Sequence, residues 1–366
     1  MKTRLLFLSI ILFIISRGHL KAETISVVNG DDLQAKVDSA SAGDILVISA
    51  GQYLQTVKID KKLTLIGPGY FKLQGGTAYI NSIWLDVGSD GSMLTGLVVS
   101  GNLNIASSNN LVSRNKIDGT LYLGYTTINY ATSNNKVVQN YFGSQNSSIP
   151  GIKVGSSSIV IQTNYQISNN VVMNSIGFAH SMYSTGLVVN NIFDPDSTNI
   201  GNSAGQYISV SGGISSVSFY NNIFKGGFCH STTTTGSTIF STSNPLYHPL
   251  NFKYNIIDTV YAGYTIPVDN LVTTERIFAG YPTIINGMNN ADARILLDPT
   301  GPAVGFGRSY PYSGSDPTTD AGVFGGSLPY VLSGIPIGPQ VYEMVVPPLA
   351  ATNSTITVKV KARSNN

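Results

Sequence analysis

Short clusters of hydrophobic residues, separated by glycine, asparagine and serine, recur along most of the chain. The repeated unit is an asparagine with an apolar residue three positions before it and another two positions after it. The apolar residues are β-branched or aromatic and come in short runs, which predicts strands rather than helices. The six copies have their asparagine at Asn115, Asn140, Asn170, Asn191, Asn222 and Asn255.

The distance between the two apolar residues of each copy predicts a bend at the asparagine. Side chains on one face of a strand are two residues apart, so apolar residues five apart both point inward only if the chain turns between them. We expect the asparagine itself to adopt the left-handed backbone conformation at this turn, because it tolerates that conformation best among non-glycine residues. On the same reasoning Gly96, between Met93 and Val98, fits a seventh copy.

The spacing between copies predicts stacked coils. With Gly96 as the first anchor, successive anchors lie 19, 25, 30, 21, 31 and 33 residues apart, which indicates a constant element joined by loops of variable length. Asparagine amides stacked one strand spacing apart, about 4.8 Å, can donate to and accept from one another as a ladder. The predicted fold class is therefore all-β, a single right-handed parallel β-helix of about ten coils.

The two ends of such a solenoid need covers. At the N-terminal end, Asp31 is expected to cap a short helix, with Gln34 completing a capping box. Near the C-terminus, polar and apolar residues alternate over 355–361, which predicts one half-buried strand, either returning along the solenoid as a cover or belonging to a flexible tail. The expected organisation is a β-helix domain over 23–330 and a C-terminal extension or capping strand over 331–366. The apolar stripe of the short helix is expected to consist of Leu33, Val37 and Ala40.

The first 22 residues have the features of a secretory signal peptide. Lys2 and Arg4 precede an apolar run over 5–15, which is too short to span a bilayer. Cleavage is expected after Ala22 or, alternatively, after Gly18. The protein is therefore predicted to be secreted, periplasmic or on the cell surface, with no membrane segment in the mature chain.

Composition excludes several classes of partner. Charged residues make up 11% of the chain and hydrophobic residues 42%, with a formal net charge of +2, which is not the profile of a disordered protein. Because no run of lysine or arginine is present, neither nucleic acid nor an anionic membrane is a predicted partner. Cys229 is the only cysteine, so no internal disulfide can form.

Two stretches resemble a known superfamily. Residues 30–71, GDDLQAKVDSASAGDILVISAGQYLQTVKIDKKLTLIGPGYF, are similar to the opening of right-handed parallel β-helix proteins of the pectin-lyase-like superfamily. DPTGPAVGFG, residues 298–307, and DAGVFGG, residues 320–326, resemble the closing turns of secreted bacterial, Bacteroidota-like members. The resemblance implies the fold over roughly 24–330 but no single function, since the superfamily holds lyases, hydrolases, epimerases, phage tailspikes and adhesins.

The resemblance also implies which catalytic sites to look for. Pectate-lyase-like enzymes hold calcium with clustered carboxylates and abstract a proton with arginine or lysine, whereas polygalacturonase-like enzymes group three aspartates around a histidine. Apart from Asp31-Asp32 in the predicted N-terminal cap, the sequence contains no Asp-Asp pair, and it contains no Gly-His-Gly of the hydrolase kind.

One row of charges remains as a candidate. Three positions after the anchor, Asp194, Lys225 and Asp258 follow one another on consecutive coils, which places opposite charges about 5 Å apart. The row is either an ion ladder of structural value or a lyase-like lysine held by carboxylates above an acidic glycan.

Two further sequence patterns resemble ligand sites. Asp194, Asp196 and Asn199 resemble a calcium loop, but an ordinary Asx turn explains them, so no metal site and no cofactor is predicted, with Ca²⁺ as the alternative. Tyrosines spread over the coils could stack on sugars. They include Tyr122, Tyr125, Tyr130, Tyr141 and Tyr165.

Two functions follow from these observations. The uncharged surface of asparagine, serine, threonine and tyrosine, together with the missing acid clusters, favours a non-catalytic secreted β-helix that binds a polysaccharide or cell-surface glycan or acts as a surface scaffold. The alternative is a divergent polysaccharide lyase or glycoside hydrolase that acts on an acidic glycan, with Lys225, Asp194 and Asp258 as its catalytic residues.

Overall fold

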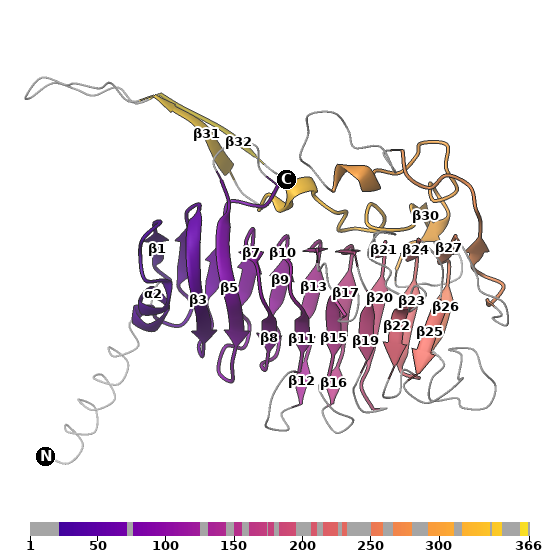
Figure 1. The fold of residues 1–366 in the computed structure, drawn as a ribbon, viewed down its shortest axis with the longest axis horizontal. Helices are drawn as coiled ribbons and strands as arrows, with labels where there is room; N and C mark the ends of the chain where they lie inside the picture. The colour runs from indigo at the N-terminus through magenta and orange to yellow at the C-terminus, as the bar shows by residue number, and fades with distance from the viewer. Residues whose placement is uncertain are drawn as a thin grey trace, which may run out of the picture.

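Parallel strands stacked coil upon coil form the body of the protein (Figure 1). The computed structural model describes most of the chain from residue 22 onward. The described ranges are 22–71, 76–124, 131–143, 150–155, 161–173, 175–178, 183–194, 206–210, 215–225, 229–232, 250–258, 266–279, 292–310, 317–336, 339–345 and 359–364. The predicted signal peptide lies outside them. No helix in these ranges is long and apolar enough to cross a membrane.

The first sheet contains ten parallel strands, one from each successive coil, so the prediction of a right-handed parallel β-helix of about ten coils is confirmed. Neighbouring strands are in register, so that Val137, Ile167, Val188 and Phe219 lie one above the other and are fully buried. The strands are β1 (Thr24–Val27), β2 (Ile45–Ile48), β4 (Thr64–Ile66), β6 (Met93–Thr95), β9 (Leu111–Ser113), β13 (Lys136–Val138), β17 (Tyr165–Ser168), β20 (Gly186–Val189), β23 (Val217–Tyr220) and β26 (Asn251–Lys253).

The second sheet divides into two rows of strands. Its long strands β3 (Gly51–Ile59) and β5 (Ala78–Leu85) pair with each other, and the two halves of β5 then pair with β7 and β8. One row is β7 (Val98–Val99), β10 (Lys116–Ile117), β14 (Tyr141–Phe142), β18 (Val171–Val172), β21 (Ile192–Phe193), β24 (Ile223–Phe224), β27 (Ile256–Ile257) and β28 (Leu271–Val272). The other is β8 (Leu103–Ile105), β11 (Leu121–Leu123), β15 (Ile152–Val154), β19 (Ile176–Phe178), β22 (Gln206–Val210) and β25 (Cys229–Thr232). A small separate sheet pairs β12 (Thr132–Ser133) with β16 (Gln162–Thr163).

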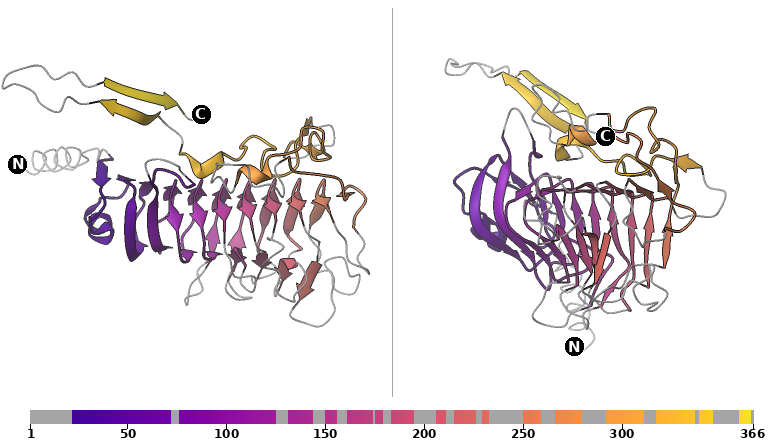
Figure 2. Two further views of the ribbon diagram at one scale, coloured as in Figure 1. Left: turned by 45° about the horizontal axis from the view of Figure 1, so that its top comes forward. Right: turned by 45° about the vertical axis from the view of Figure 1, so that its right-hand side comes forward.

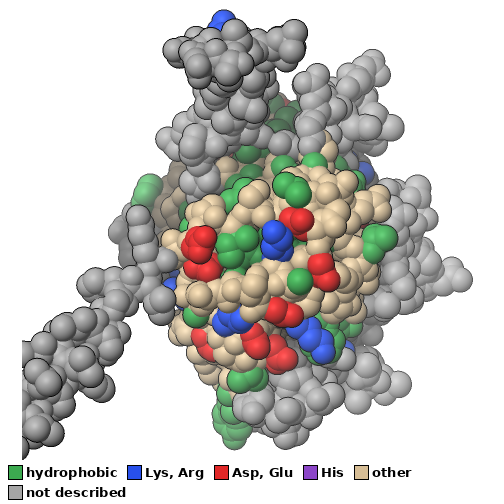
Figure 3. Space-filling view, turned by 90° about the vertical axis from the view of Figure 1, so that its left-hand side faces the viewer, with side chains coloured by type: hydrophobic (Ala, Val, Ile, Leu, Met, Phe, Trp, Pro, Cys, Tyr) green, Lys and Arg blue, Asp and Glu red, His purple; other side chains and the backbone are tan. Residues whose placement is uncertain are grey.

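A short helix, α2 (Leu33–Ser39), covers the first coil. Leu33, Val37 and Ala40 are buried against the solenoid, as predicted. The prediction of the cap was wrong by one residue, because the Asp32 side chain, not that of Asp31, accepts the hydrogen bond from the backbone N–H of Ala35. Gln34 does not complete a capping box, since its side chain bonds the backbone of β3 instead. Figure 3 shows this end of the molecule, where acidic and basic side chains are interspersed, as a solvated cap requires.

After the last coil the chain returns along one side of the solenoid (Figure 2). We call residues 292–310 and 317–336 the strap. It contains η2 (Ala293–Ile295), η3 (Leu332–Gly334) and the antiparallel pair β29 (Gly307–Arg308) and β30 (Thr318–Thr319). Apolar strap residues form a second core against the outer side of the coils. This core includes Ile295, Ala303, Ala321 and Val323 from the strap and Tyr141, Ile192 and Ile223 from the coils.

A buried aspartate at the start of the strap is hydrogen-bonded to residues near the end of the strap. The Asp292 side chain is fully buried and accepts hydrogen bonds from the Tyr330 hydroxyl at 3.1 Å and the Ser333 backbone N–H at 2.6 Å. The Tyr330 hydroxyl is also hydrogen-bonded to that of Tyr70 in the solenoid. Burial raises the pKa of the Asp292 carboxyl. This cluster therefore ties the strap to the coils through polar groups removed from water.

The C-terminal segment forms a hairpin of its own. β31 (Pro339–Val345) and β32 (Lys359–Ser364) pair in an antiparallel sheet that is separate from the solenoid sheets, and the hairpin projects from the coils (Figures 1 and 2). The predicted strand around Lys359 and Lys361 therefore exists, but it pairs with β31 instead of returning along the coils.

Candidate functional site

The predicted asparagines form one continuous file inside the corner of the solenoid. Each side-chain Nδ2 donates to the Oδ1 of the asparagine on the next coil at 2.9 to 3.2 Å, and all six are buried. The file is Asn115, Asn140, Asn170, Asn191, Asn222 and Asn255, and it ends on a seventh residue, Asn270. The sequence pattern missed Asn270 because Pro267 occupies the place where the other copies have Val, Ile or Phe.

The left-handed turn lies one residue before the ladder, which corrects the expectation that the ladder asparagine adopts it. We call these preceding residues the corner row; their φ angles are between 54° and 60°. Gly96, with a φ of 72°, occupies the corresponding position one coil earlier, and Leu97 occupies the ladder position of that coil. The backbone N–H of Leu97 donates to Asn115 Oδ1 at 3.0 Å. The corner row is Arg114, Gln139, Asn169, Asn190, Asn221 and Tyr254.

The corner row holds the strap. Asn169 Nδ2 donates to the backbone oxygens of Val323 at 2.9 Å and Gly325 at 2.8 Å. Asn221 exchanges two hydrogen bonds with the backbone of Arg308, at 2.7 and 3.0 Å. Arg114 donates to the oxygen of Ile335, Gln139 to that of Leu328, and Tyr254 lies beneath the Arg308 guanidinium.

Asn190 is the exception in the corner row. Only 5% of this residue is exposed, yet its Oδ1 accepts no hydrogen bond from the described residues. The strap passes close over it at Gly326, where an added Cβ would lie 2.4 Å from Asn190 Nδ2. A buried amide oxygen without a donor is costly, because it has lost its hydrogen bonds to water. Asn190 is thus the corner-row residue whose side-chain oxygen is hydrogen-bonded neither to the strap nor to the coils among the described residues.

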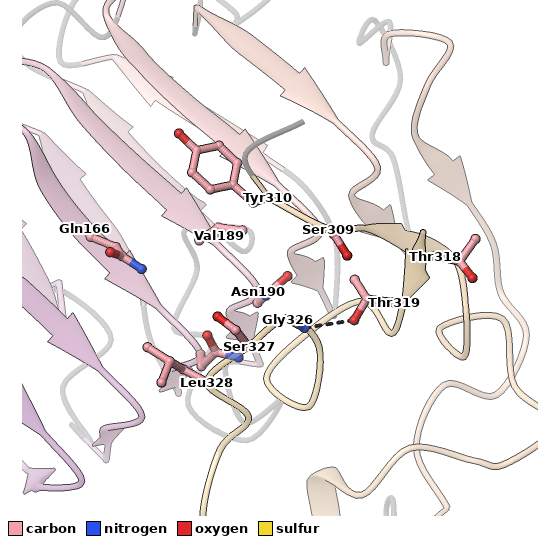
Figure 4. A pocket seen from close by; sticks show the side chains of 11 residues that line it. Gln166, Val189, Asn190, Ser309, Tyr310, Thr318, Thr319, Gly326, Ser327 and Leu328 are labelled. Carbon is pink, nitrogen blue, oxygen red and sulfur yellow. Dashed lines mark hydrogen bonds between the residues drawn. The ribbon is translucent and has the colours of Figure 1, made fainter. Parts of the chain in front are cut away.

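A cleft of about 320 Å³ opens beside Asn190, between the ends of β17 and β20 and the strap (Figure 4). The Gly326 N–H donates to Thr319 Oγ1 at 2.8 Å and so fixes the strap loop at the cleft. The Tyr310 ring, half exposed, stands at the other side and packs against Tyr220 at 5.7 Å. The lining residues are Gln166, Asn169, Val189, Asn190, Ser309, Tyr310, Thr318, Thr319, Gly326, Ser327 and Leu328.

The chemistry of the cleft is uncharged. Among the described residues its lining contains no aspartate, glutamate, lysine, arginine or histidine. Amides and hydroxyls donate and accept, and an aromatic ring offers an apolar face with a polar tip. Such a surface suits a ligand that carries many hydroxyl groups and no net charge.

The charged row predicted from the sequence lies elsewhere on the solenoid. Asp194, Lys225 and Asp258 directly follow β21, β24 and β27, which stack in register, so they occupy one row on consecutive coils. Lys225 Nζ lies 2.6 Å from Asp258 Oδ2, while Asp194 is buried with 1% exposure. The Lys225–Asp258 ion pair links two neighbouring coils. Asp196 and Asn199 of the suggested calcium loop lie outside the described residues.

Other sequence candidates are not assembled into a site. Tyr141 and Tyr165 are buried, so they offer no sugar-stacking face, and burial raises the pKa of Tyr141 to about 12. Tyr122 lies below Lys153, whose Nζ is 6.0 Å from the ring centre. Tyr125 and Tyr130 lie outside the described residues. Within the described ranges, no group of three or more His, Cys, Asp or Glu residues could hold a metal ion.

Comparisons with known proteins do not give a family for the chain. No family model matches the chain, and no curated protein matches it in sequence. Among solved structures, the crystal structure of pectate lyase Pel9A is similar, with a TM-score of 0.49 and 12% identity over 83% of this chain and 96% of that chain. This likeness assigns neither a family nor an activity to the protein.

Proposed function

We propose that the protein is a secreted, non-catalytic β-helix that binds a glycan in the cleft beside Asn190. The observation that carries this proposal is the buried Asn190 oxygen, which has no donor, in a cleft lined by uncharged polar side chains. A sugar hydroxyl that donates to this oxygen would relieve a cost of roughly 1–3 kcal/mol. The Tyr310 ring would pack against the apolar face of the same sugar.

A glycan array tests this function. The full chain after removal of residues 1–22 is expected to bind one or more oligosaccharides on an array of neutral and acidic plant, algal and bacterial glycans. Tyr310→Ala should weaken that binding by about tenfold, because it removes the exposed ring of the cleft. Tyr79→Ala is the matched control, since Tyr79 is similarly exposed at 45% but lies on β5, away from the cleft. No binding to any glycan, or equal loss in both variants, would contradict the proposal.

Export is part of the proposal and has its own test. We infer that residues 1–22 are a signal peptide removed after Ala22, or after Gly18, and that the mature protein comprises a β-helix domain to residue 330 and a C-terminal extension. Mass spectrometry of the protein purified from outside the cytoplasm should give one of these two N-termini. An intact Met1 in the exported protein would contradict the inference.

The alternative function is a lyase or hydrolase at the charged row, favoured by the Lys225–Asp258 ion pair. Incubation with acidic polysaccharides would then yield unsaturated ends, seen as absorbance at about 235 nm, or new reducing ends. Product that disappears in Lys225→Ala but persists in Tyr310→Ala would replace the binding proposal by this one. Binding without any product would support the non-catalytic function.

A further inference from the structure

A second pocket adjoins the cleft on the side of the last coils. Its volume is about 340 Å³, and Thr318 lines both it and the cleft. The wall between the two is the ribbon of β29 and β30, in which Arg308 is paired with Thr318. Successive residues of a strand point to opposite faces, and accordingly Ser309 lines the cleft whereas Arg308 lines the second pocket. The remaining lining residues are Tyr254, Val268, Asp269, Asn270, Leu271, Gly305 and Phe306.

The Arg308 guanidinium is the unusual group of this pocket. Its Nη1 donates to the backbone oxygens of Phe306 at 3.2 Å and Gly307 at 2.9 Å, and its centre lies 5.2 Å from the Tyr254 ring. Its Nε and Nη2 donate to none of the described residues, and no carboxylate among them forms an ion pair with Arg308. A guanidinium always carries its charge, so Arg308 contributes a cation with unused donors to the lining of the pocket.

The one carboxylate that lines the second pocket does not neutralise this cation. Asp269 Oδ2 is paired with Lys253 Nζ at 3.1 Å. The other carboxylate beside the pocket, Asp320, accepts the Gly305 backbone N–H at 2.9 Å and is not within ion-pair distance of Arg308. The described residues of the neighbouring cleft carry no charge, so the two pockets differ in the ligand they favour although they share a wall.

The distance between the pockets suits one ligand that spans both. The Arg308 backbone is hydrogen-bonded to Asn221, the corner-row residue on the coil directly after that of Asn190, which is roughly 5 Å away at the strand spacing. That is about the length of one sugar unit along a glycan chain. A glycan with one unit beside Asn190 would therefore bring its neighbouring unit to Arg308.

We propose that Arg308 and Tyr254 form a second subsite that takes an anionic group, a carboxylate or a sulfate ester, on the sugar next to the one in the cleft. The inference rests on the proposed glycan binding and narrows its ligand to a glycan that carries such a group beside an uncharged unit. Arg308 would bind the anionic oxygens with its unused Nε and Nη2 donors. Arginine binds carboxylates and sulfate-like groups in this way, with two parallel hydrogen bonds. The stacking on Tyr254 holds the guanidinium in place for this contact.

Titration calorimetry with matched oligosaccharides tests the subsite. The probes are κ-carrageenan tetraose against the same tetraose after desulfation, and xylotetraose against the same chain with a methylglucuronic acid branch. We expect the full mature chain to bind the anionic member of one pair about tenfold more tightly than the neutral member, as one charge-assisted contact supplies. This preference should shrink as salt is raised. The pair that shows it identifies sulfate or carboxylate as the anionic group.

Two variants of Arg308 sharpen the result. Arg308→Gln should bind both members of the pair with the affinity that the wild type has for the neutral one, and Arg308→Lys should keep part of the preference. Equal affinity of the wild type for both members, or a preference that survives in Arg308→Gln, would overturn the subsite and leave the glycan-binding proposal intact. Absence of binding to every glycan of the array and to all four probes would overturn both.

Discussion

Two adjacent rows of residues run along the same corner of the solenoid and differ in almost every respect. The ladder row points inward and is asparagine from Asn115 to Asn270, whereas the corner row, one residue earlier, faces the strap and holds four residue types. Every ladder amide finds its partners on the neighbouring coils. The corner residues share only a left-handed backbone, because the turn demands that conformation and nothing else of them.

This difference separates what the fold requires from what it leaves open. A buried amide in the ladder has no substitute, since each one forms hydrogen bonds with both the coil before it and the coil after it. A corner residue has a fixed backbone and a variable outward side chain. Five of the six use that side chain on the strap, and Asn190 does not.

Removing a ladder amide should have the largest effect. In Asn191→Gly the backbone N–H and Nδ2 of Asn170, which both donate to Asn191 Oδ1 at 3.0 Å, lose their acceptor in the core. Together with the flexibility of glycine, we expect a loss of roughly 3–5 kcal/mol in the free energy of unfolding. Urea denaturation followed by circular dichroism measures it. A loss below about 1 kcal/mol would show that the ladder is not essential to stability.

The same substitution in the corner row should cost less. Asn169→Gly keeps a left-handed backbone that suits glycine but removes both bonds to the strap. We expect a loss of roughly 1–2 kcal/mol, together with faster hydrogen exchange in strap residues 323–326. Unchanged exchange there would contradict the assignment of the corner row to strap binding.

The anchor at Asp292 should appear as a dependence of stability on pH. Because burial raises the pKa of this carboxyl in the native state, the native state favours the protonated form. Its contribution is therefore most favourable below the unfolded-state pKa of about 3.9 and is lost as the pH rises through the raised native value. Urea midpoints between pH 3 and pH 7 should fall less steeply with rising pH in Asp292→Asn than in the wild type.

A control for the pH series is available on the same strap. The backbone N–H and the hydroxyl of Thr300 lower the pKa of Asp298, so its contribution has the opposite sign: it is present above the unfolded-state pKa and lost as the pH falls. Asp298→Asn should therefore remove stability at neutral pH. The same pH slope in the wild type and in Asp292→Asn would contradict the role given to the anchor.

Asn190→Gly should have the smallest effect on stability. The variant keeps the left-handed backbone and removes a side chain whose oxygen has no donor. We expect the free energy of unfolding to change by no more than about 0.5 kcal/mol, because removal of the unpaired oxygen offsets the lost packing of the side chain. A loss as large as that of Asn169→Gly would mean that Asn190 serves the fold after all.

The fold followed from the sequence because the ladder imposes a local rule that each coil repeats. The same rule gave the position of Asp194, Lys225 and Asp258 in one row. The predicted position of the left-handed residue is one residue too late in each coil. The sequence shows that Gly96 replaces a residue of the repeat, but it does not show whether Gly96 stands at the ladder position or at the corner position before it. Leu97 in the ladder position is the feature that would have corrected it.

The cleft was beyond the reach of the sequence for a different reason. It forms where the strap, more than a hundred residues later in the chain, passes over Asn190, and nothing in the repeat predicts which coils the strap meets. Asn190 has the same local sequence as Asn221, within Asn-Asn-Ile-Phe, and yet only Asn221 bonds the strap. The two are distinguished by long-range packing alone.

The most direct test of the account is the affinity of Asn190→Gly for the oligosaccharide that the wild type binds best, measured by titration calorimetry. We expect a folded protein of unchanged stability whose affinity is about tenfold lower, because the ligand loses the Asn190 oxygen to which the proposed function assigns it. Wild-type affinity in this variant would contradict the claim that Asn190 is kept for a ligand.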